Sequence, residues 1–190
     1  MKPVVKAFLI LVALVVAAGA GVVAYVATTG MSAREEPGAI ETFLARTLRN
    51  FAIARRARQL SNPIERAPEI IAAGRAHFAD HCAACHDNSG SGDTTFGRGM
   101  WPKPPDLRSN ETQKLSDGEI FYIIEHGIRF SGMPGFGTGS ADDQKASWHL
   151  VHFVRHLPDI SQPELAEMEQ LNPKPAGEND GHSAPAPHTH

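Results

Sequence analysis

The longest uninterrupted pattern in the chain is an apolar run near its start. Residues 7–29 carry no charged side chain, and a stretch of that length can cross the hydrocarbon core of a bilayer as a helix. Lys2 and Lys6 precede the run, and no further cation occurs before Arg34. Because cytoplasmic flanks are enriched in cations, this distribution keeps the N-terminus inside and exports the rest of the chain. Residues 1–30 are therefore predicted to form a transmembrane anchor.

A cleaved signal peptide is the alternative for the same residues. Phe8–Val16 would be its apolar segment, and the small residues Ala-Gly-Ala at 18–20 would fit a cleavage site. The apolar run continues beyond that site to Val26, which favours a retained anchor. Both interpretations place the remaining chain outside the cytoplasm.

Residues 31–67 show an apolar stripe on an otherwise charged segment. Apolar side chains recur at helical spacing between residues 37 and 60, and Arg and Glu occupy the other faces. Pro63 and Pro68 end the pattern. The segment is predicted to be an amphipathic helical linker, either a spacer or a helix that docks on the next domain or on a partner subunit. Its apolar positions are Ile40, Phe43, Leu44, Leu48, Phe51 and Leu60.

Residues 68–160 carry three helical patterns separated by long loops. The first helix is expected over Glu69–Ala84. The second follows the sequence Ser-Asp-Gly-Glu at residues 116–119, which matches a capping box. The third is expected over Asp142–Leu157. No stretch alternates as a strand does, so the predicted fold class is all-α.

Residues 161–190 are predicted to be a polar tail. After Leu171 the chain consists of Pro, Gly, Ala and polar residues, a composition typical of disorder. The histidines of this tail, His182, His188 and His190, are spaced irregularly. They are interpreted as incidental rather than as metal ligands.

The charge of the chain gives no sign of nucleic-acid binding. The formal net charge is -3, and no basic patch is interleaved with aromatic residues. Residues 28–67 hold seven Lys or Arg against four acids, whereas residues 68–160 hold eight against twelve. An acidic domain of this kind can be steered towards a basic patch on a partner protein.

The two cysteines of the chain lie three positions apart and are followed by a histidine. The run Cys82-Ala-Ala-Cys85-His86 has the spacing at which two thiols add to one haem and the adjacent imidazole binds the iron. A haem would also stabilise a domain of about 90 residues whose short helices make a thin core.

Three other chemistries use cysteines at this spacing. A thioredoxin-like redox pair requires a strand–helix context, which the pattern lacks. A zinc site could combine Cys82 and Cys85 with His77 and either His81 or His86, but all its ligands would crowd into one segment. A local disulfide is the third alternative.

The order of motifs in residues 70–158 resembles the class I, mitochondrial-type cytochrome c domain in its compact bacterial form. The chain as a whole is similar to a membrane-anchored monohaem bacterial c-type cytochrome. The resemblance implies a few helices enclosing one haem c. The residues that carry it are Gly74-x-x-x-Phe78, Cys82-x-x-Cys85-His86, Pro105-Asp106-Leu107, the Gly127–Phe136 loop and Trp148-x-Leu150-Val151-x-Phe153.

The resemblance also implies a role for each residue of the site. Cys82 and Cys85 would form the thioether bonds, His86 would be the proximal ligand of the iron, and Met133 the distal ligand. The carbonyl of Pro105 would accept a hydrogen bond from the other ring nitrogen of His86, as metal-bound histidines generally require.

Met100 is the rival of Met133. It lies only fifteen positions after Cys85, in the stretch expected to wrap the proximal side, so Met133 is the favoured ligand.

Histidine–methionine ligation predicts an electron-transfer protein rather than an enzyme. Two protein ligands leave no open position for a substrate, and a thioether favours ferrous iron. The expected partners are redox proteins of a respiratory or periplasmic chain, with the haem domain in the periplasm at the bacterial inner membrane. The alternative is an enzyme or gas-binding protein whose distal ligand is absent or displaceable.

Overall fold

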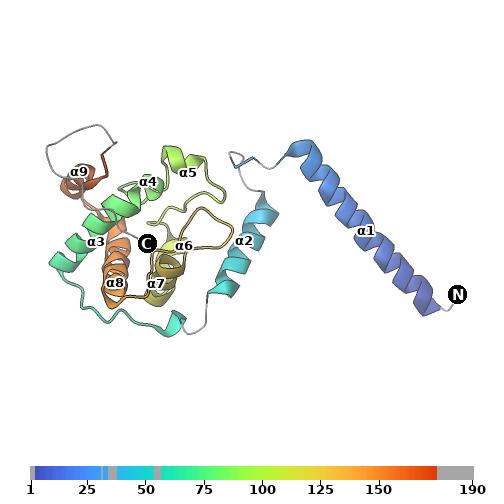
Figure 1. Cartoon of the computed structure of the whole chain (residues 1–190), viewed down its shortest axis with the longest axis horizontal. Helices are drawn as coiled ribbons and strands as arrows, with labels where there is room; N and C mark the ends of the chain where they lie inside the picture. The colour runs from blue at the N-terminus through green and yellow to red at the C-terminus, as the bar shows by residue number, and fades with distance from the viewer. Residues whose placement is uncertain (1–2, 31, 34–37, 54–56, 175–190) are drawn as a thin grey trace. The chain divides into compact units, whose positions relative to one another are not determined.

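The computed structural model describes residues 3–30, 32–33, 38–53 and 57–174, and all regular structure within them is helical. The all-α prediction is thus confirmed (Figure 1). The chain divides into two compact units, Met1–Glu35 and Glu36–His190.

The first unit is a single long helix. Helix α1 covers Pro3–Thr29, and 27 residues at 1.5 Å each span about 40 Å, more than a hydrocarbon core requires. The mean hydropathy of its candidate span is 2.8, and none of it is buried. The helix therefore has the length and composition of a membrane span, a test that an N-terminal signal sequence also passes.

The second unit is built on the crossing of two helices, α3 (Pro68–His81) and α8 (Ala141–His156). At Gly74 a Cβ atom would lie 2.3 Å from the backbone oxygen of His149, so only glycine permits this approach. The rings of Phe78 and Phe153 meet at the crossing with centroids 5.1 Å apart. The two helices therefore pack closely at Gly74.

Helix α7 (Asp117–His126) completes the central packing against α8. It begins at the predicted capping box, in which Ser116 and Glu119 satisfy each other's backbone N–H groups. The ring of Phe121 stacks on that of Trp148 with centroids 4.0 Å apart. These contacts extend the core, whose fully buried large side chains are Phe78, Val151, Phe153, Leu157 and Met168.

Two predicted segments differ from the observed ones in detail. The helix expected over Glu69–Ala84 is interrupted at Cys82, where φ is -107°, and continues as the short helix α4 (Ala83–His86). The segment from 87 to 114, predicted as loop, contains two single-turn helices. These are α5 (Thr95–Arg98) and α6 (Asn110–Gln113).

The described residues of the amphipathic linker from residue 38 onward belong to the second unit and contact the helices of the next domain, one of the arrangements left open by the sequence. They form helix α2 (Ala39–Ala52) and the 3₁₀ helix η1 (Ala57–Gln59); residues 54–56 lie outside the described part. Helix η1 packs on α7, because Gly118 leaves room for the backbone of Ala57.

Helix α9 (Gln162–Leu171) was not predicted, because residues 161–190 were expected to form a polar tail. Met168 is its only buried residue, so the sequence has no apolar stripe that would predict this helix. It packs on α3, where Arg75 reaches Glu164 at 2.8 Å. The sequence signal was the capping box of Ser161 and Glu164. Residues 175–190, including the three tail histidines, lie outside the described part.

The contacts of the Glu164 carboxylate should make the packing of α9 on the domain sensitive to acid. Burial pulls its pKa upward, but hydrogen bonds from Ser161 and from His156 outweigh burial and lower the pKa from 4.5 to about 2. Because the folded-state value lies below the unfolded one, the stabilisation is complete above about pH 4.5 and is lost as the pH falls towards 2.

Glu164→Gln keeps the capping geometry and removes the charge. We expect it to lower the free energy of unfolding at pH 6 by up to about 3 kcal/mol and to have little effect near pH 2. Denaturant titrations at both pH values measure this difference. Glu167→Gln, which alters a more exposed partner of Arg75, is the control. Equal effects of the two substitutions at both pH values would contradict the assignment.

Candidate functional site

The cysteine–histidine motif lies where α3 passes into α4. Backbone N–H groups of Cys85 and His86 donate to the carbonyl of Cys82 at 3.1 and 2.9 Å. This turn brings positions i, i+3 and i+4 to one side of the chain. Both thiols are half-buried and unbonded. The two sulfurs and the imidazole are therefore gathered on one short segment.

The Cys82 thiol is held in its neutral form. Burial raises its pKa to about 12, and the nearby Cys85 and Asp80 act in the same direction. Reactive redox cysteines are thiolates, so this environment does not suit a redox pair. Within the described residues, moreover, no group of three or more His, Cys, Asp or Glu side chains could hold a metal ion. The thioredoxin-like and zinc alternatives thus lose their support.

The His86 ring is also neutral, the form in which an imidazole binds a metal. Burial lowers its pKa, and the carbonyl of Pro105, which faces the ring, partly offsets this by favouring the protonated form. The buried Nδ1 atom makes no well-aligned hydrogen bond to any described group. Its nearest acceptor is thus the carbonyl that the sequence singled out.

Pro105 is placed beside His86 by two glycines in the intervening loop. The N–H of Gly92 donates to the carbonyl of His86 at 2.8 Å. A Cβ on Gly92 would lie 2.5 Å from the carbonyl oxygen of Pro104, and its φ of +75° also favours glycine. The N–H of Leu107 then donates to the carbonyl of Gly90 at 2.8 Å. The proline segment therefore runs directly along the turn that follows His86.

Met133 lies in contact with His86, so the two predicted iron ligands come together. Its loop leaves α7 at Gly127, where φ is +64° and a Cβ would lie 2.6 Å from the carbonyl oxygen of Met133. The N–H of Ile128 donates to that oxygen at 3.1 Å, and the hydroxyl of Ser131 accepts from the N–H of Met133 at 3.1 Å. The loop is thus a tight, internally bonded turn.

A buried carboxylate that the sequence reading missed ties this loop to two helices. The side chain of Glu125, on α7, accepts a hydrogen bond from the hydroxyl of Ser147, on α8, at 2.6 Å. The backbone oxygen of Glu125 accepts from the N–H of Gly137 at 3.1 Å. The only available signal was an acidic residue four positions after Phe121, on the apolar face of its helix.

Met100 lies beside the Met133 loop, although the segment before it runs along Cys85 and His86 as predicted, with Gly92 bonded to His86 and Thr94 to Cys85. A Cβ on Gly132 would lie 3.0 Å from the Met100 sulfur. Both thioethers therefore lie near the same loop, and Met133 is in contact with His86.

The residues around the motif fit a covalently bound haem. The Cys82 thiol can become a thioether without losing a stabilised charge, and the His86 imidazole is in contact with the Met133 thioether. Partly buried apolar side chains pack against the core, as the contact with an apolar macrocycle requires. Among them are Cys82 itself, Leu107, Phe121 and Phe136.

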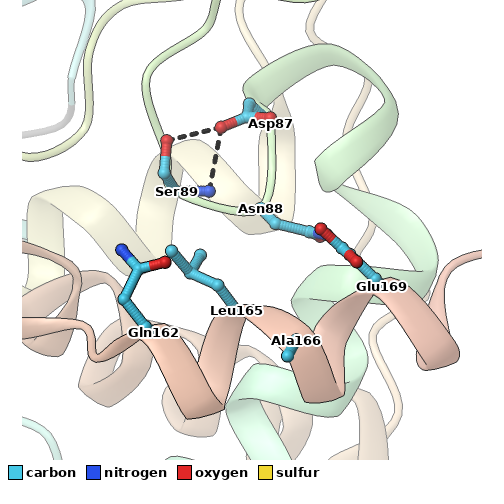
Figure 2. A pocket seen from close by; sticks show the side chains of 7 residues that line it. All are labelled: Asp87, Asn88, Ser89, Gln162, Leu165, Ala166 and Glu169. Atoms are coloured by element: carbon cyan, nitrogen blue, oxygen red, sulfur yellow. Dashed lines mark hydrogen bonds between the residues drawn. The ribbon is translucent and has the colours of Figure 1, made fainter.

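A separate cavity of about 260 Å³ lies between α9 and the residues that follow His86 (Figure 2). It is lined by no cysteine, histidine or methionine. Asp87 there accepts a hydrogen bond from the N–H of Ser89 at 3.0 Å, which occupies its carboxylate locally. The cavity is therefore polar and distinct from the haem candidate. Its lining residues are Asp87, Asn88, Ser89, Gln162, Leu165, Ala166 and Glu169.

Comparison with known families agrees with this geometry. A family model described as cytochrome c oxidase, cbb3-type, subunit III matches residues 69–154. The match begins in α3, ends in α8 and contains every residue of the candidate site. No curated protein matches the chain. Residues 69–154 are therefore a cytochrome c domain, and the chain carries an N-terminal apolar helix before it.

Proposed function

We propose that the protein is a one-electron carrier or electron-transfer subunit with a single covalent haem c. The observation that carries the proposal is the contact between His86 and Met133 in a domain with two half-buried, unbonded cysteines. Cys82 and Cys85 would form the thioether bonds to the haem, and His86 and Met133 would bind its iron. The bound haem supplies the one-electron chemistry of its iron.

The side chains of the site hold a fixed ligand set rather than a substrate. In the haem-bound protein the carbonyl of Pro105, which faces the ring, would accept a hydrogen bond from Nδ1 of His86. This bond would orient the ring and leave Nε2 for the iron. The bonds of the Met133 loop to Ser131 and to α7 hold the thioether in place. Because both positions are filled by protein ligands, the site is suited to a change of charge with little movement.

The proposed location is the periplasmic face of the bacterial inner membrane. Helix α1 serves as a retained single-pass anchor, and the cations before it keep the N-terminus in the cytoplasm. The family model is named for a subunit of a respiratory oxidase, which supports redox proteins of a respiratory chain as partners. The excess of acids in residues 68–160 favours a partner with a basic docking surface.

The spectrum of the purified protein tests the proposal. We expect a c-type haem that resists acid–acetone extraction, and a reduced spectrum that carbon monoxide leaves unchanged. The same protein unfolded in denaturant, where the methionine detaches, should bind carbon monoxide and is the positive control. A native protein that binds carbon monoxide would favour the gas-binding alternative, and a colourless protein would exclude haem altogether.

A further inference from the structure

Helix α2 carries an apolar face that is exposed along its whole length. Ile40 is 78% exposed and Phe51 is 87% exposed, at opposite ends of the helix. All five apolar residues lie on one face, since they follow helical spacing. No described residue covers them. The apolar face of α2 consists of Ile40, Phe43, Leu44, Leu48 and Phe51.

The opposite, polar face of α2 is turned towards the haem unit. Arg46 forms an ion pair with Glu111 at 2.7 Å, and the indole N–H of Trp101 donates to Glu41 at 2.8 Å. These two residues flank the polar face, and Thr42, between them, is only half-exposed. The apolar face therefore points away from the unit, and covering it requires something outside it.

The nearest apolar environment in the proposed arrangement is the bilayer that holds α1. Nine residues, 30–38, separate the two helices. At about 3.3–3.6 Å per residue, the start of α2 can be no more than about 35 Å from the end of α1. A short tether of this kind gives an effective concentration in the millimolar range, so even a weak affinity for the surface is sufficient.

The charges around α2 match a phospholipid surface. Residues 28–67 hold seven Lys or Arg against four acids, and the apolar face itself carries no charge. Arg46 and Arg49 lie on the polar face, as in helices that rest in the headgroup region with their apolar face towards the acyl chains. The acidic haem domain alone would not be drawn to an anionic bilayer.

We propose that α2 lies in the surface of the bilayer, with its apolar face inserted at the boundary of headgroups and acyl chains. This inference rests on the proposed anchoring by α1. Because the polar face of α2 is bonded to the haem unit, the unit is held at a fixed height and orientation above the membrane. It is then not free to swing on a flexible tether.

Nitroxide labels on the two faces of α2 test this placement in the full-length holoprotein. Leu44→Cys places a label near the centre of the apolar face. Ala45→Cys, the next residue and about 100° further round the helix on its polar side, is the matched control. Both variants are reconstituted in phosphatidylethanolamine–phosphatidylglycerol vesicles. Collision rates of each label with oxygen, which concentrates in lipid, and with a water-soluble nickel chelate are then measured. The relaxation rate of the same sample under nitrogen is subtracted, which removes the contribution of the haem.

The label at position 44 should meet oxygen several-fold more, and the nickel chelate several-fold less, than the label at position 45. Equal exposure of both labels to nickel would overturn the proposal, because α2 would then be in water. Shielding of position 44 from both reagents would also overturn it, since a second copy or a partner protein would then cover the face.

Two controls separate this proposal from the ones on which it rests. Flotation of the vesicles reports whether α1 anchors the protein. The wild-type protein should take up no label, because thioether sulfurs do not react; labelling of the wild type would count against the proposed haem attachment and not against the position of α2.

Discussion

Replacing Cys82 or Cys85 with serine should leave very little folded protein. At most one thioether bond can then form, and the haem is held far less firmly. The helical unit has a thin core, so binding of the cofactor contributes directly to folding. We expect loss of most of the haem-stained protein on denaturing gels and of most of the helical signal in circular dichroism.

Ala84→Ser is the matched control for these substitutions. It adds a hydroxyl at an exposed position between the two cysteines and leaves both thiols in place. Haem content and helicity should stay close to those of the wild type. A stable, helical Cys82→Ser apoprotein would show instead that the packing of α3 on α8 is sufficient for folding, and that the haem contributes function alone.

The parts of the fold that the sequence predicted depend on local signals. The capping box of Ser116 sets the start of α7, and Gly127 its end, through atoms only a few residues apart. The spacing of Gly74, Phe78 and Cys82, which places all three on one helix face, is also a local pattern. The Cys-x-x-Cys-His run is equally local, and it supported the prediction of a cytochrome c domain, which the family model matches.

The parts that escaped prediction depend on contacts between distant segments. Helix α9 is attached through Met168 and the Arg75–Glu164 pair, and a single buried residue leaves no periodic pattern. The link between Glu125 and Ser147 joins residues 22 positions apart. The position of Met100 beside Gly132 likewise joins residues 32 positions apart.

The position of Met100 makes the distal ligand the sharpest remaining test. Two methionine sulfurs lie near one loop, and either could in principle reach an iron bound by His86. The contact of Met133 with His86 and the bonds that hold its backbone favour Met133. Substituting each methionine in turn therefore decides between them.

Met133→Ala should keep the haem covalently attached, because Cys82, Cys85 and His86 are untouched, and should open the sixth position of the iron to carbon monoxide. The charge-transfer band between sulfur and ferric iron should vanish, and the reduction potential should fall, since the ligand that favours ferrous iron is gone. Stability should drop by about 2 kcal/mol or more, because a half-buried methionine site is emptied and a ligand bond is lost. Met100→Ala should keep the band and the potential and lose only packing against Gly132. If Met100→Ala removes the band while Met133→Ala keeps it, Met100 is the ligand, and the attachment of the haem at Cys82 and Cys85 is unaffected by that result.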